Sequence, residues 1–149
     1  MKVGFVGSSG GHLTPLLWLR SWWEPHERFW VCLRAADSEA ALAGESVTWG
    51  YGPTNRSGVN AVRNTGLAYR VLRRERPDVL VSCGAGLAVP FFAVGRALGI
   101  PLVYIEVVDR VETPSWTGKL VSPWCDAVVV QDARQLAFYP TAHLLGPIR

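Results

Sequence analysis

The chain has 149 residues, 49% of them hydrophobic, and its 15 basic and 12 acidic side chains give a formal net charge of +3. This length suits a single domain, residues 1–149, with a buried core. The three cysteines, Cys32, Cys83 and Cys125, form no C-x-x-C pair, so we expect neither a disulfide framework nor a metal site. The basic excess is mostly arginine and does not indicate a nucleic-acid partner.

No segment is expected to be a signal peptide or a membrane span. The apolar start, residues 3–6, is too short for a signal peptide. The longest uncharged run, residues 79–95, is interrupted by Gly84, Gly86 and Pro90, which is untypical of a spanning helix. We therefore expect any membrane contact to be peripheral.

Short apolar runs alternate with helical patterns along the chain. In chain order, strands are expected at residues 3–6, 29–33, 46–49, 79–82, 102–105 and 127–130, and helices at residues 14–23, 35–43, 60–76, 87–98 and 116–121. The last segment, residues 139–149, has a turn-like composition. Alternation of this kind predicts a Rossmann-like α/β fold, a parallel sheet with helices on both faces.

The first expected loop has the sequence G-x-x-G-G-H, residues 7–12. A glycine-rich turn between a strand and a helix favours an anion, because helix N-terminal amides attract negative charge. The loop matches neither the dinucleotide fingerprint nor the P-loop. Arg34 stands where an NAD domain has an acidic residue, which leaves open an NADP site or a purely structural turn.

Two side chains in the loops beyond the carboxyl ends of the expected strands are candidates for chemistry. His12 closes the first loop and is either a general base, a phosphate ligand or an ordinary histidine at the start of a helix. Glu106 follows a very apolar strand and is either a catalytic or ligand-orienting carboxylate or the partner of Arg110 in a loop salt bridge. His26 and His143 have no metal-like spacing to His12.

The helix expected at residues 87–98 is apolar on nearly every side and contains Phe91 and Phe92. Such a helix either packs on the sheet or exposes a face to lipid. The chain also has seven tryptophans, a residue favoured at interfaces and at the membrane boundary. Contact with a partner or a bilayer is therefore one interpretation of this composition.

Three blocks together resemble one family. They read GSSGGHL at residues 7–13, RPDVLVSCGAGLAVPFF at residues 76–92 and YIEVVDRVETPSWTGKLVSPWCDAVVVQ at residues 104–131. The family is the acceptor-side subunit of split UDP-sugar glycosyltransferases, which includes asparagine-linked glycosylation protein fourteen and bacterial capsule and exopolysaccharide relatives. A more distant likeness is to the N-terminal half of the peptidoglycan lipid II synthase.

The resemblance implies the N-terminal half of a GT-B glycosyltransferase. It implies an enzyme subunit with no cofactor of its own, active with a donor-binding partner subunit that holds the UDP-sugar. The sugar, N-acetylglucosamine or a hexose, would pass to a polyprenyl-diphosphate-linked sugar acceptor at the cytoplasmic face of the cell membrane. The chain has the length expected of that first half.

The resemblance also suggests roles for individual residues. The catalytic candidates are His12 and Glu106. The acceptor-binding candidates are Gly10, Gly11, Gly84, Gly86, Arg110, Ser115 and Thr117, and the membrane-contact candidates are Phe91, Phe92, Trp22 and Trp23.

Two positions depart from the family pattern, Val107 where serine is common and the turn Cys83-Gly84-Ala85-Gly86, and both put the acceptor preference in doubt. The alternatives are a non-catalytic scaffold that docks a transferase to the membrane and an NADP-binding domain.

Overall fold

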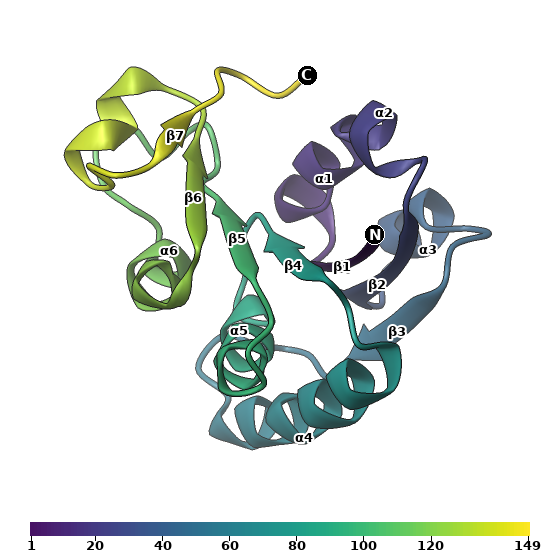
Figure 1. The fold of residues 1–149 in the computed structure, drawn as a ribbon. Coiled ribbons are helices and arrows are strands. Elements are labelled where there is room, and N and C mark those ends of the chain that lie inside the picture. Colours follow the sequence, from purple (N-terminus) through teal and green to yellow (C-terminus); the bar gives the residue numbers. More distant parts are fainter.

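The computed structural model describes all residues, 1–149, as a seven-stranded parallel sheet between two layers of helices (Figure 1). The strand order is β3-β2-β1-β4-β5-β6-β7. The strands are β1 (Lys2–Val6), β2 (Glu27–Leu33), β3 (Val47–Gly50), β4 (Val79–Ser82), β5 (Leu102–Ile105), β6 (Ala127–Val130) and β7 (His143–Leu144). The predicted Rossmann-like fold is confirmed.

The chain runs from β1 to one edge of the sheet at β3, returns to β4 on the other side of β1, and continues to the opposite edge at β7. The α-helices are α1 (Thr14–Trp18), α2 (Arg20–Trp23), α3 (Ala36–Ala41), α4 (Gly58–Glu75), α5 (Ala88–Ala97) and α6 (Trp116–Val121). Three 3-10 helices complete the elements, η1 (Gly10–His12), η2 (Ser122–Trp124) and η3 (Ala133–Ala137). In Figure 1, α1 and α2 lie above the sheet and α4 and α5 lie below it.

Each face of the sheet carries its own hydrophobic core. One core joins α4, α5 and α6 to the sheet and includes Leu72, Phe91, Phe92 and Val121. The other joins α1 and α2 to the opposite face and includes Leu16, Trp23 and Trp30. Burial on both faces explains why the central strands are short and almost wholly apolar.

Three of the four side chains predicted to contact a membrane are buried, which corrects that expectation. Phe91 and Phe92 are 0% exposed and Trp23 is 3% exposed. The helix around Phe91 is apolar on nearly every side because it packs between the sheet, α4 and α6, the usual position of such a helix. Trp22 alone of the four is exposed, at 42%.

The N-terminal helical segment differs from the single helix that the sequence predicts. It is divided at Leu19, whose ψ of 16° leaves the α-helical range. The indole N–H of Trp23 donates to the carbonyl oxygen of Leu16 at 2.8 Å, and this bond ties α2 to α1. Two short helices therefore replace the single helix expected at residues 14–23.

The C-terminal segment, expected to be turn-like, adds the seventh strand. His143 pairs with Val129 and Leu144 with Val130. Both strand residues are exposed, so no apolar pattern marks them in the sequence. No helix in the structure combines the length and the apolar character that crossing a bilayer requires.

Candidate functional site

Loops that follow β1 and β5 surround a hollow of about 440 Å³ at the carboxyl edge of the sheet. We call it the His12 hollow. Its lining residues are Gly11, His12, Thr14, Pro15, Trp18, Val107, Val108, Asp109, Arg110 and Ser115. Ligands of open parallel sheets bind beyond the carboxyl ends of the strands, which makes this hollow the candidate site.

The backbone of η1 presents His12 to the hollow. Gly10 has φ of +74°, a left-handed conformation that favours glycine. Its amide donates to the Asp37 carboxylate at 2.8 Å, so this N–H is already bound within the protein. The Gly10 amide is therefore not available to the anion that the sequence predicts for this loop, because it already binds a side chain of α3.

The ring of His12 is oriented by one hydrogen bond, 3.2 Å from Nδ1 to the carbonyl oxygen of Cys83. A carbonyl oxygen only accepts, so Nδ1 must carry the proton that this bond requires. In the neutral ring, Nε2 is then left with its lone pair. His12 can therefore act as a hydrogen-bond acceptor or a base toward a group in the hollow.

Gly84 makes room for this histidine. A Cβ atom at position 84 would lie 3.1 Å from Nδ1 of His12 and 3.3 Å from the Tyr104 hydroxyl, and φ is +118°. The amide of Gly84 donates to the Ser82 hydroxyl at 3.0 Å. The prediction that this amide binds the acceptor is corrected, because the amide is buried and already bound; the glycine instead lets the loop after β4 approach His12.

Glu106 is completely buried, at 0% exposure, and its carboxylate accepts hydrogen bonds from several groups of the chain. Oε1 accepts from the Tyr104 hydroxyl at 3.1 Å and from the amide of Val107 at 3.0 Å. Oε2 accepts from the amide and the hydroxyl of Ser115, each at 3.1 Å, and from the Tyr139 hydroxyl at 2.5 Å. The oxygen lone pairs of this carboxylate are thus all bound by donors of the protein itself.

Neutral donors alone surround Glu106, since no Lys, Arg or His lies within ion-pair distance of it. Burial and the charge of Glu106 raise the pKa of Tyr104 above its ordinary value, and burial with the bond to Glu106 raises the pKa of Tyr139. Both phenols therefore keep the protons that they donate. The salt bridge between Glu106 and Arg110, one of the two alternatives that the sequence left open, is absent. The carboxylate instead binds neutral donors of the protein.

The network of Glu106 joins segments that are distant in the sequence. The Ser115 hydroxyl accepts from the amide of Gly118 at 3.0 Å and so caps α6. Gln131 donates to the carbonyl oxygen of Glu106 at 2.9 Å and accepts from the amide of Ile148 at 2.9 Å. The end of β5, the start of α6 and the C-terminal segment are therefore fixed to one another.

Two residues of this network were not predicted from the sequence. Tyr139 lies 33 positions from Glu106 in a segment expected to be turn-like, so no spacing links the two. Gly118 belongs to α6, and a Cβ there would overlap the Tyr139 hydroxyl and lie 2.7 Å from Oε2 of Glu106. Only glycine lets the helix lie this close to the buried carboxylate.

The structure distributes the predicted acceptor-binding residues over two hollows. Gly11, Arg110 and Ser115 line the His12 hollow, whereas Gly86 and Thr117 line a second hollow of about 670 Å³, which we call the Trp116 hollow. Its full lining is Thr54, Asn55, Arg56, Ala61, Gly86, Val89, Pro90, Trp116, Thr117 and Leu120. The N-terminus of α6 contributes to both hollows, Ser115 to the first and Trp116 to the second.

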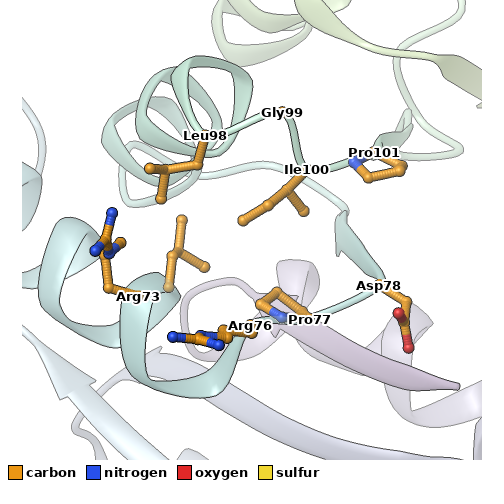
Figure 2. Close-up of a pocket in the computed structure, with 9 residues that line it drawn as sticks. Arg73, Arg76, Pro77, Asp78, Leu98, Gly99, Ile100 and Pro101 are labelled. Atoms are coloured by element: carbon orange, nitrogen blue, oxygen red, sulfur yellow. The ribbon is translucent and has the colours of Figure 1, made fainter.

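A third hollow, of about 530 Å³, lies at the opposite, amino end of the strands (Figure 2). Arg73 and Arg76 from the end of α4 face Leu98 and Ile100 from the end of α5 across it. It holds none of the predicted site residues, and ligands of this sheet type bind at the other edge. No three His, Cys, Asp or Glu side chains in the structure are grouped as metal ligands would be.

Relatives with known names match the chain over different lengths. A human protein named UDP-N-acetylglucosamine transferase subunit ALG14 is 33% identical over 88 residues, 55% of this chain and 41% of the relative. A Symbiobacterium thermophilum protein named UDP-N-acetylglucosamine–N-acetylmuramyl-(pentapeptide) pyrophosphoryl-undecaprenol N-acetylglucosamine transferase is 27% identical and covers 90% of this chain and 39% of the relative. The chain thus spans about two fifths of the length of these relatives.

Solved structures with the same fold include MurG from Acinetobacter baumannii, with a TM-score of 0.74 at 18% identity over 89% of this chain and 42% of that one. A UDP-N-acetylglucosamine 2-epimerase from Rickettsia bellii gives a TM-score of 0.75 at 12% identity over 93% of this chain and 40% of that one. The family model described as "Oligosaccharide biosynthesis protein Alg14 like" matches residues 53–148, which include Glu106, Ser115 and Tyr139. The chain belongs to this Alg14-like family.

Proposed function

We propose that this protein is the acceptor-binding subunit of a two-component glycosyltransferase. It would present the hydroxyl of a polyprenyl-diphosphate-linked sugar to a UDP-sugar held by a donor-binding partner chain. The observation that carries this proposal is the His12 hollow itself, whose lining contains both an imidazole with an available Nε2 and Arg110, a guanidinium without an ion-pair partner. The names of the human and Symbiobacterium relatives support the substrate classes.

In the proposed step, the acceptor hydroxyl oxygen bonds to the anomeric carbon of the donor sugar while the bond from that carbon to UDP breaks. The hydroxyl proton passes to Nε2 of His12, which the Cys83 carbonyl holds in the required tautomer. Arg110 pairs with the acceptor diphosphate, since guanidinium binds phosphate oxygens through two parallel hydrogen bonds. Inversion at the anomeric carbon follows from the family likeness.

Glu106 has a different role in this proposal. Because its oxygens are buried and occupied, we assign it to positioning the loop 107–114 and α6, and we assign the base to His12. Gly11 lines the site, and Ser115 contributes through the cap of α6 and its bond to Glu106.

The donor-binding half is proposed to come from a second polypeptide. The chain has one Rossmann-like sheet and spans 42% of the MurG chain that it resembles in fold. A UDP-sugar bound by a partner would have to face the carboxyl edge of this sheet, where His12 and Arg110 lie. The human relative is itself named as a subunit.

Peripheral membrane contact is proposed for the surface around the Trp116 hollow. Trp116 and Leu120 on α6 line this hollow and are 80% and 47% exposed. Contiguous exposed apolar side chains mark interaction sites, and Lys119 beside Trp116 adds a positive charge for anionic lipid. This surface replaces Phe91, Phe92 and Trp23 in the proposal, and Trp22 stays a second candidate.

The exposed apolar surface also fits the alternative of a scaffold that docks a transferase to the membrane without a catalytic group. A reconstitution separates the two functions. Purified chain, a donor-binding chain, a labelled UDP-sugar and vesicles containing a polyprenyl-diphosphate-linked sugar are combined, and sugar transfer is measured. We expect transfer that requires both chains and is lost with Arg110→Ala; transfer that proceeds at the same rate without this chain on detergent-dispersed acceptor would contradict a role in acceptor binding and support the scaffold.

A further inference from the structure

Trp18 differs from the other six tryptophans of the chain. Trp23 and Trp30 are buried in the core under α1 and α2, and Trp124 packs against the core on the other face of the sheet. Trp22 contacts Phe5 and His26, Trp49 lies beneath Arg34, and Trp116 lies beneath Lys119. Trp18 is 52% exposed, belongs to neither core, and has no aromatic or cationic partner.

The position of Trp18 in the fold puts this unpartnered ring at the candidate site. It is the last residue of α1, and it lines the His12 hollow together with His12 itself. Pro15 and Trp18 are three positions apart and so lie on the same side of the helix, where both contribute to the wall of the hollow. The helix that begins next to the proposed base thus carries an indole ring along the same wall.

A second segment of the lining has a different chemistry. It is the loop after β5, with Val107 and Val108 followed by Asp109 and Arg110. Asp109 and Arg110 are exposed and have no ion-pair partner in the chain. The lining of the hollow therefore combines an aromatic side chain with unpaired hydrogen-bonding charges.

We propose that Trp18 is the platform on which the acceptor's sugar ring stacks, and that it makes this subunit prefer a sugar-bearing diphosphate to a bare one. The inference rests on the proposed function and deepens it. A pyranose ring has an apolar C–H face and a rim of hydroxyls. The indole covers the face, Asp109 accepts from hydroxyls of the rim, and Arg110 pairs with the diphosphate beyond it.

A sugar fits these walls better than the isoprenyl chain does. An isoprenyl chain in the same place would cover His12, Asp109 and Arg110 with hydrocarbon and leave their polar atoms without partners, which is costly. A sugar satisfies both the aromatic surface and the polar groups. The isoprenyl chain is then directed away from the His12 hollow.

Binding to the full chain tests this proposal directly. The probes are geranyl diphosphate and geranyl diphosphate carrying N-acetylglucosamine or glucose, and dissociation constants are measured by calorimetry. For the wild type we expect at least one sugar-bearing probe to bind about tenfold more tightly than the bare probe. Trp18→Ala should remove this preference while leaving the affinity for the bare probe unchanged, and Trp18→Phe should retain most of it.

The matched control is Tyr69→Ala, since Tyr69 is an aromatic residue with the same 52% exposure that lies on α4 outside the hollow. This variant should keep the full sugar preference. Equal binding of sugar-bearing and bare probes to the wild type, or a preference that survives in Trp18→Ala, would overturn the role of Trp18 and leave the proposed acceptor site standing. Failure of the wild type to bind any of these probes would overturn the acceptor site as well.

Discussion

The loop after β1 and the connection after β5 each bring one candidate catalytic residue to the same edge of the sheet, and the two residues are held in opposite ways. His12 has one hydrogen bond, to a carbonyl oxygen, and faces the hollow. Glu106 is 0% exposed and receives hydrogen bonds from two phenols, two amides and a hydroxyl. His12 therefore has its Nε2 atom available to a ligand, whereas both carboxylate oxygens of Glu106 are already bound.

The glycines near these two residues differ in how closely other atoms approach them. A Cβ at Gly10 or Gly11 would meet no atom within 4 Å, so these glycines serve the backbone conformation or leave open space above the loop. A Cβ at Gly84 or Gly118 would press on His12 or on the Glu106 network. Glycine in the second group is required because side chains must approach the backbone closely.

The largest expected effect on folding is that of Glu106→Gln. The glutamine side chain has only one oxygen, so its amide nitrogen would face donors that now bind Oε1 or Oε2. Each buried donor without an acceptor costs about 1–3 kcal/mol, so we expect the free energy of unfolding to fall by at least about 3 kcal/mol in urea denaturation. Glu112→Gln, in the exposed part of the same connection, should change it by less than about 0.5 kcal/mol; equal effects of the two substitutions would refute a structural role for Glu106.

A smaller loss is expected from Gly118→Ala. Alanine normally stabilises a helix interior by up to about 1 kcal/mol relative to glycine. Here the added methyl would lie 2.7 Å from Glu106 Oε2 and 2.9 Å from Ser115 Oγ, so we expect a loss of about 1–3 kcal/mol from overpacking. Gly66→Ala on α4, where a Cβ meets nothing within 4 Å, should show the ordinary gain, and a gain at both positions would contradict the tight packing of α6 on Glu106.

Gly84→Ala should affect turnover more than it affects stability. The methyl would push the ring of His12, because a Cβ there lies 3.1 Å from Nδ1, and a misplaced catalytic group can cost about 100-fold in rate. Gly99→Ala is the control for a positive φ, since Gly99 has φ of +74° against +118° at Gly84 but open space around its Cβ. It should lose about 1–2 kcal/mol of stability with its turnover intact; a Gly84→Ala enzyme with wild-type turnover would show that the Gly84 contact does not orient His12.

Much of the fold could be predicted from local pattern. The six longer strands are largely buried or half-buried runs of four to seven residues, and α6 spans the residues 116–121 expected from the sequence. The strand β7 could not be predicted because its two residues are exposed and are held only by backbone pairing with β6.

The sequence predicts which loops lie together at one edge of the sheet better than it predicts the role of each residue in them. Parallel topology brings the loops of His12 and Arg110 to one edge, and both line the same hollow. Sequence alone could not show that Glu106 is satisfied from within, because the Tyr139 hydroxyl reaches it from 33 positions away. Nor could it show that α5, although as apolar as a lipid-facing helix, has Phe91 and Phe92 at 0% exposure.

The division of roles between His12 and Glu106 is tested most directly by measuring turnover and unfolding together for His12→Ala in the reconstituted two-chain enzyme. The account predicts that kcat falls by about 100- to 10,000-fold, that added imidazole restores part of it, and that the free energy of unfolding stays within about 0.5 kcal/mol of the wild type. Wild-type turnover in His12→Ala would contradict the account.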